Sequence, residues 1–423
     1  MQEDFLHYIW KYKKFSQSDL KTVANEVILI TSVGEHNLNA GPDFFNVQVR
    51  IGGQLWAGNV EIHIKSSDWF VHNHERDKAY DNVILHVVWE HDTEVFRKDN
   101  SVIPTLVIKD YVSPSALKNY TKLFNSKDSW INCENDFSGV DDFTISNWFE
   151  RLYFERLERK SQDILKLLES SKNDWEAVLF KMLPKNFGLK VNGEAFLSMA
   201  NSFEFSILRK SQSKLVHLEA LLFGQSGLLE AQIEEPYYQS LQKEYQYLSQ
   251  KFNLNNETVV SPSFFRLRPN NFPTIRLSQL AHLFHAHQNL FSKVIDATAL
   301  EDIYDLFTVA PSEFWKTHYT FSKVSKARKK NVTKSFIDLL IVNTIVPLKF
   351  SYAKSQGKSI DNEILELIES LSSEKNSIVD KFNSLKKVGD NALHSQALIQ
   401  LKTEYCDKNQ CLKCAVGNKL LNR

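Results

Sequence analysis

Residues 44–65 have the sequence FFNVQVRIGGQLWAGNVEIHIK, and this stretch decides the fold of the first part of the chain. From Phe45 to Ile51, apolar side chains alternate with polar ones, and a period of two is typical of a strand with one buried face. Gly52-Gly53 is a two-residue hairpin signal. We therefore expect a β-hairpin whose second strand runs from Leu55 to Lys65.

Three more segments are expected to be strands beside this hairpin. Residues 27–30 and 105–108 are short apolar runs. Residues 82–89, NVILHVVW, are almost wholly apolar, as in a central strand that is buried on both faces. Helices are expected at about residues 3–13 and 74–80.

The spacing of the apolar residues changes after residue 141. Apolar positions there recur at spacings of three and four, which predicts amphipathic helices through the rest of the chain. The predicted fold class is α+β. We expect a mixed β-sheet module in residues 1–135, followed by a large all-α region in residues 136–423.

The composition is that of an ordinary globular protein, with 43% hydrophobic and 24% charged residues. The 51 basic and 51 acidic residues balance, which excludes a polycation that coats nucleic acid by bulk charge but allows a local basic patch. No apolar run approaches the roughly 18 residues of a membrane helix, and the acidic N-terminus is unlike a signal peptide. We expect a cytoplasmic protein with reduced cysteines and no membrane partner.

Two carboxylates and an imidazole are expected to meet at the open end of the hairpin. Glu61, His63 and Lys65 lie two residues apart on one strand and so share a face. A turn at Gly52-Gly53 places Asp43 opposite about residue 62, beside Glu61 and His63. This set can bind Mg²⁺ or Mn²⁺, which can activate water and stabilise a departing phosphate oxygen. The alternative is a solvated polar face on an edge hairpin.

Three more histidines follow close behind in the sequence. His72 and His74 share a face only if their segment is extended. They are either a further metal contact, a pH-sensitive hydrogen-bonding pair, or part of a polar loop that caps a helix. His86, inside the apolar strand, is either a buried histidine satisfied by a neighbour or a catalytic contact.

Pro42-Asp43, followed by Glu61-Ile62-His63 on a strand, resembles the motif of the PD-(D/E)XK nucleases over about residues 1–125. The resemblance implies a restriction-endonuclease-like mixed sheet flanked by helices, with Asp43 and Glu61 as metal ligands. It also implies a lysine two residues after the glutamate that positions the attacking water. Here His63 stands at that place and Lys65 follows one strand step later. Either His63 acts as ligand or base, or Lys65 reaches back, or the site is inactive.

Nearly the full chain also resembles a bacterial protein family of unknown function, which implies no activity. The stretches that carry this resemblance are AGPDFFNVQV (40–49), GNVEIHIKSSDWFVHNHERDKAYDNVILHVVW (58–89), RPNNFPTIRLSQLA (268–281), FWKTHYTFSK (314–323) and CDKNQCLKCAVGNKLL (406–421).

The four cysteines fit a single scheme. Cys406, Cys411 and Cys414 have the spacing C-x₄-C-x₂-C, and Cys133 stands alone near the domain junction. Together they can supply the four sulfur ligands of a tetrahedral Zn²⁺ or of a [4Fe–4S] cluster. Some PD-(D/E)XK exonucleases are similar in carrying an iron–sulfur cluster with cysteines on both sides of the nuclease motif, although their spacing differs. The alternative is four unrelated thiols.

Two basic segments of the helical region are candidates for binding phosphates. Guanidinium groups match phosphate geometry, and basic residues beside aromatic ones suit single-stranded nucleic acid. The alternatives are arginines paired with buried carboxylates and a solvated helix face. The candidate residues are Arg266, Arg268 and Arg276 in the first segment, and Lys326, Arg328 and Lys329 in the second.

The function these features predict is that of a metal-dependent, nuclease-like protein acting on phosphodiesters of nucleic acid. Asp43, Glu61 and His63 would be metal ligands, and Lys65 or His63 would act on the attacking water. A second hypothesis is a non-catalytic binding or scaffold protein with a degenerate nuclease fold and a structural metal at the cysteines. Metal-dependent hydrolysis of another ester is a third. No feature of the sequence identifies a protein partner.

Overall fold

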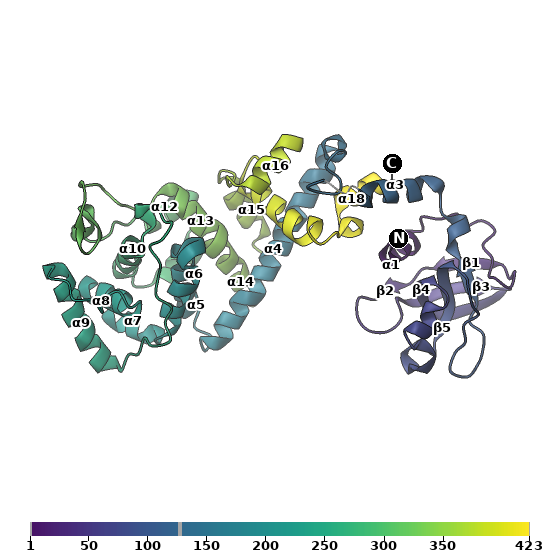
Figure 1. The fold of residues 1–423 in the computed structure, drawn as a ribbon, viewed down its shortest axis with the longest axis horizontal. Helices are drawn as coiled ribbons and strands as arrows, with labels where there is room; N and C mark the ends of the chain where they lie inside the picture. The colour runs from purple at the N-terminus through teal and green to yellow at the C-terminus, as the bar shows by residue number, and fades with distance from the viewer. Residues whose placement is uncertain (1, 126–128, 423) are drawn as a thin grey trace. The chain divides into compact units, whose positions relative to one another are not determined.

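The structure is a computed structural model that describes residues 2–125 and 129–422 (Figure 1). The predicted α+β class is confirmed, because a mixed sheet is followed by a large helical region. The chain packs as two compact units, Met1–Trp148 together with Leu401–Arg423, and Phe149–Gln400. This differs from a single division at residue 135, since the end of the chain packs with the sheet-containing unit.

The first unit is built on one six-stranded sheet with the order β1-β3-β4-β5-β6, and β2 pairs with β3. β3 and β4 form the predicted antiparallel hairpin, whereas β5 runs parallel to β4 and β6 parallel to β5. The strands are β1 (Ile28–Ser32), β2 (Glu35–His36), β3 (Phe44–Ile51), β4 (Gln54–Lys65), β5 (Val83–Glu90) and β6 (Thr105–Val107).

A bulge near the start of β3 shifts the hairpin register by one residue. The pairing that the Gly-Gly turn predicts holds from Ile51 with Gln54 to Val47 with Gly58, but Phe44 then pairs with Val60. Asn46 takes a left-handed conformation with φ of 57°, which inserts the extra residue. As a result, Asp43 comes opposite Glu61 rather than residue 62.

A crossover connection joins the parallel strands β4 and β5, as parallel pairing requires. It contains α2 (Asp68–Val71) and two short 3₁₀ helices, His74–Arg76 and Lys78–Tyr80, where the sequence predicts one helix. Trp69 of α2 is fully buried in a cluster with Tyr80 and with Val83 of β5, which also includes Val95 and Ile103. The crossover is therefore anchored to the sheet rather than left as a free loop.

Helices from both ends of the chain complete the first unit. α1 packs against β4, and α18 packs against α3. The elements are α1 (Glu3–Lys11), α3 (Pro114–Phe124), α18 (Ala415–Leu421), 3₁₀ helices at Ile108–Tyr111, Phe137–Gly139 and Cys411–Lys413, and a π-helical turn at Leu401–Cys406.

The second unit is helical apart from a small ribbon of β7 (His318–Thr320) and β8 (Lys323–Val324). The 3₁₀ helices are Pro269–Asn271 and Glu313–Lys316, and a π-helical turn covers Ile341–Ile345. The α-helices are α4 (Asp142–Ser170), which begins in the first unit, α5 (Trp175–Phe187), α6 (Leu189–Asn201), α7 (Phe205–Ser211), α8 (Leu215–Gln225), α9 (Pro236–Phe252), α10 (Pro273–Ala286), α11 (Leu290–Asp296), α12 (Leu300–Phe307), α13 (Lys334–Leu340), α14 (Val346–Ser355), α15 (Asp361–Glu369), α16 (Ser377–Leu385) and α17 (Ala392–Gln400).

Contrary to the expectation that no apolar stretch approaches the length of a membrane helix, the continuous helical stretch Lys334–Ser355 is long and apolar enough, by length and composition alone, to cross a membrane. Its apolar window is 78% buried inside the protein, as is usual for the core helix of a helical domain.

Candidate metal centre

Asp43 and Glu61 lie next to each other at the open end of the hairpin, and each carboxylate accepts a hydrogen bond from a backbone N–H of the facing strand segment. The backbone N–H of Asp43 donates to Glu61 Oε2 at 3.1 Å, and the backbone N–H of Ile62 donates to Asp43 Oδ2 at 2.9 Å. Glu61 is only 5% exposed. The structure therefore brings together the two carboxylates that the hairpin geometry predicts to meet.

His63 lies beside Glu61, with its Nε2 atom 3.5 Å from Glu61 Oε1. The same Nε2 atom is 3.1 Å from His72 Nδ1, and the other ring nitrogen, Nδ1, is 2.9 Å from His86 Nε2. His63 and His86 are both buried, whereas His72 is exposed. Asp43, Glu61 and His63 thus lie together as predicted, and His72 extends the group to the surface.

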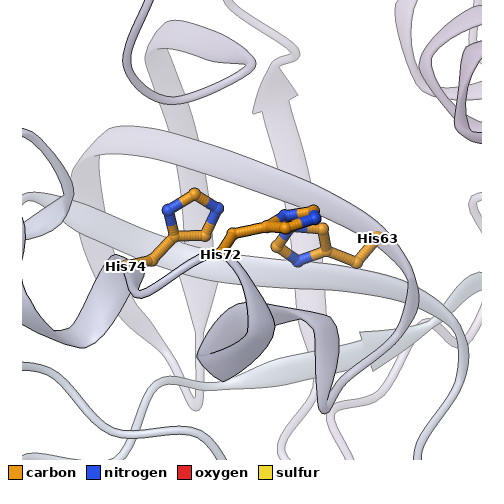
Figure 2. A group of neighbouring side chains, drawn as sticks. All are labelled: His63, His72 and His74. Carbon is orange, nitrogen blue, oxygen red and sulfur yellow. The ribbon is translucent and has the colours of Figure 1, made fainter.

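His74 joins the group from the crossover, with Nε2 3.2 Å from Glu61 Oε1. Its ring stacks on Tyr80 at 3.8 Å between centroids, which fixes its orientation. Asn73, between the two histidines, is left-handed with φ of 60°. This turn, rather than an extended segment, directs both His72 and His74 toward His63 (Figure 2).

The spacing of these donors matches a first coordination shell. Ligand nitrogens of His63, His72 and His74 all lie within 4.8 Å of one another, and theirs is the sole such group of three or more found in the part of the chain that the structure describes. A tetrahedral ion with metal–nitrogen bonds of 2.0–2.1 Å separates its ligands by about 3.4 Å. The distances of 3.1, 3.2 and 3.5 Å among these histidines and Glu61 bracket that value.

Burial sets the protonation of the group. It lowers the pKa of His63 to about 2 and that of His86 to about 3, with neighbouring histidines adding to the effect. Both rings are therefore neutral, which is the form that binds metals. Burial and the charge of Asp43 raise the pKa of Glu61 to about 9. A cation held beside Glu61 would reverse that effect and favour the carboxylate.

A second acid–imidazole pair lies next to the centre. His7 of α1 places Nε2 3.2 Å from Asp43 Oδ2. Burial acts to lower the pKa of His7, but the hydrogen bond to Asp43 and its charge outweigh this and raise it. His7 was not predicted, because it comes from a helix far from the hairpin in sequence.

Lys65 does not join the carboxylates. Its side chain is exposed, and within the described residues it forms no ion pair with Asp43 or Glu61. Its backbone N–H donates instead to Asp68 Oδ2 at 2.9 Å. The role in positioning water that the nuclease resemblance implies for Lys65 stays a prediction.

The basic candidates of the second unit divide into exposed and buried groups. Arg266, Arg268, Lys326, Arg328 and Lys329 are exposed. Arg276 is 6% exposed and donates to Gln279 and Asn271 while lying over the Phe336 ring, so it does not face a phosphate in solvent. Its predicted partners were carboxylates or phosphates, whereas the observed ones are neutral amides.

The four cysteines line one small pocket of the first unit. Of these described residues, no three bring their sulfur atoms within 4.8 Å of one another. Cys133 is therefore near the C-terminal cysteines, as the single scheme predicts, but the sulfurs are more widely spaced than the ligands of one tetrahedral ion.

Comparison with known proteins gives a family but no activity. The family described as "Protein of unknown function (DUF2851)" matches residues 3–377. No curated protein and no solved structure matches the chain.

Proposed function

The chain belongs to the DUF2851 family, and from the geometry of its histidine-rich centre we propose that it is a metal-dependent hydrolase acting on phosphodiesters of nucleic acid. The single observation that carries this proposal is the convergence of His63, His72 and His74 on a point beside Glu61. Three imidazoles favour a transition ion such as Zn²⁺ or Mn²⁺ over Mg²⁺, which prefers oxygen ligands.

The arrangement is that of a catalytic rather than a closed structural site. Three protein nitrogens leave a coordination position for water, and a bound ion of this kind lowers the pKa of water to about 7. Glu61 Oε1 lies beside His63 and His74 and would accept the proton of a water bound there. His72, His7 and Asp43 are at least partly exposed, so a substrate can approach from their side.

His7 and Asp43 are suited to the second half of the reaction. Asp43 holds His7 through Nε2, and its charge favours the protonated imidazole. A protonated His7 beside the centre can donate a proton to the oxygen that leaves phosphorus. Lys65 has no part in this scheme, because it lies apart from the carboxylates.

The choice of a nucleic acid substrate is supported by two features. The Pro42-Asp43 and Glu61-Ile62-His63 motif resembles the PD-(D/E)XK nucleases, with His63 in place of the lysine. The second unit exposes Arg266 and Arg268, and also Lys326, Arg328 and Lys329. Both features are compatible with phosphate binding.

The test is cleavage of linear duplex DNA, single-stranded DNA and RNA by metal-stripped protein reloaded with Zn²⁺, Mn²⁺ or Mg²⁺. We expect cleavage with a transition ion, and a loss of about 100-fold or more in Glu61→Gln and His72→Ala. His285→Ala is the matched control for His72→Ala, because both side chains are exposed and His285 lies in the other unit. Cleavage that survives both substitutions at the centre would exclude it as the active site.

A non-catalytic scaffold is the second candidate, favoured by the position of Lys65 away from the carboxylates. In that case calorimetry detects metal binding that depends on His72, yet no nucleic acid is cut with any of the three ions.

A further inference from the structure

The four cysteines enclose a cavity that is separate from the histidine centre. Cys133 comes from the segment after α3, Cys406 ends the π-helical turn, and Cys411 and Cys414 lie at the two ends of the last 3₁₀ turn. Phe137, Leu401 and Val416 complete an apolar wall. Residues that come before and after the helical region in the sequence thus line one pocket within a single unit.

The distances among the sulfurs separate two classes of ligand. A tetrahedral Zn²⁺ with bonds of 2.3 Å holds its sulfurs about 3.8 Å apart. No three of the four sulfurs approach within 4.8 Å of one another, although all four residues line the same cavity. In a four-iron cluster each thiolate binds a different iron, so the sulfurs are spread around a larger body. The lack of three sulfurs within 4.8 Å argues against a single tetrahedral ion and is compatible with the larger body.

Amide donors surround two of the sulfurs. The backbone N–H groups of Val416 and Gly417 donate to the Cys414 sulfur, and Asn132 Nδ2 donates to Cys411 Sγ at 3.4 Å. Hydrogen bonds of this kind stabilise thiolates over thiols. In iron–sulfur proteins they also help to set the reduction potential of the cluster. We infer that Cys133, Cys406, Cys411 and Cys414 hold a [4Fe–4S] cluster.

The surroundings of the cysteines are unlike those of a reactive thiol. All four are free cysteines, and burial raises the pKa of each thiol, that of Cys414 to about 11. Nucleophilic and redox-sensing cysteines have lowered pKa values, in contrast to these. Bound iron supplies the positive charge that four buried thiolates need.

The cluster would tie the tail of the chain to the segment that follows α3. Asn132 strengthens the same junction, because its Nδ2 also lies 3.2 Å from Asn409 Oδ1. The site shares no residue with the histidine centre, so its test succeeds or fails independently of the proposed hydrolase activity.

The experiment is an iron and acid-labile sulfide assay on full-length protein, purified without oxygen and reconstituted with ferrous iron and sulfide. We expect a brown protein with about four irons and four sulfides per chain. Cys133→Ser and Cys414→Ser should each lose the visible absorption band, whereas His72→Ala keeps it.

Stoichiometric zinc that iron and sulfide do not displace, or a parent protein that takes up neither iron nor sulfide, would overturn the assignment. The metal and sulfide content of the parent decides between cluster and single ion without any variant. Circular dichroism of the two serine variants then separates loss of the cluster from loss of the fold.

Discussion

His63 Nδ1 lies 2.9 Å from His86 Nε2, and both side chains, from the neighbouring strands β4 and β5, are buried. When His63 uses Nε2 toward a cation, its Nδ1 carries the proton and donates it to His86. His86 is therefore a positioning residue that fixes the tautomer and the ring orientation of a ligand. The sequence left two roles open for His86, a buried histidine satisfied by a neighbour or a catalytic contact. Among the described residues, His86 Nε2 has His63 as its partner, whereas the buried Nδ1 atom has no hydrogen-bond partner.

Replacing His86 tests this positioning role. We expect His86→Leu to lower transition-metal affinity by about 10–100-fold, because the acceptor for His63 Nδ1–H is lost. His86→Gln keeps an acceptor and should retain more of the affinity. Competition titration against a chelator measures both variants. Equal affinity in His86→Leu and the parent would mean that the hydrogen bond does not orient the ligand.

Lys330 provides a prediction about stability rather than about binding. It is 4% exposed, and its ammonium group donates to the carbonyl oxygens of Trp315, Lys316 and His318 while lying over the Tyr319 ring. Lys330→Met removes all three of these hydrogen bonds, although the Lys316 carbonyl keeps the backbone N–H of Arg328, and should cost about 2–4 kcal/mol of unfolding free energy. Denaturant unfolding measures it, with the exposed neighbour Lys329→Met as control. A similar small effect in both variants would contradict the structural role.

The main features of the sheet follow from local signals in the sequence. The period of two and the Gly-Gly turn predict the hairpin and most of its register correctly. The bulge at Asn46 is not predicted, because the alternation of apolar residues continues through it without a break. The placement of the last residues with the first unit leaves no periodic signal in the sequence, and only the scheme that joins Cys133 to the C-terminal cysteines predicts it.

The candidate site is predictable only where strand geometry determines it. Asp43, Glu61 and His63 could be brought together by counting residues along two paired strands. His72 and His74 stayed undecided because their convergence requires the left-handed conformation of Asn73. His7 could not be foreseen, since the packing of α1 against β4 joins residues without any shared motif. The metal-binding role of the group itself stays a prediction.

Gly417 offers a test of how closely α18 packs on the cysteine loop. A Cβ atom at this position would lie 2.0 Å from the carbonyl oxygen of Cys411, so no other residue fits without displacement. Gly417→Ala should reduce the unfolding free energy by about 1–3 kcal/mol and lower iron content in parallel. Thermal unfolding and iron assays measure the two effects. Lys413→Ala, at an exposed site beside Cys414, is the control and should change neither.

His282 gives the second unit a predictable response to acid. Its Nε2 atom lies 3.1 Å from Ser312 Oγ, which also donates to the buried Glu219. Burial, with a smaller effect of His285, lowers the pKa of His282 from 6.5 to about 4. The folded state therefore disfavours the charged ring. The stability that this provides is complete above pH 6.5 and is lost as the pH falls toward 4.

The variant His282→Gln removes this titration while keeping a polar partner for Ser312. As the pH falls from about 7 to about 5, the unfolding free energy should decrease in both proteins. The decrease should be about 1 kcal/mol smaller in the variant than in the parent. Denaturant unfolding at a series of pH values measures the difference. The matched control is His217→Gln, whose ring is also half-buried and lies 3.2 Å from Glu244 Oε2. If the unfolding free energies of the parent and of His282→Gln change with pH in parallel, protonation of His282 does not destabilise the folded protein.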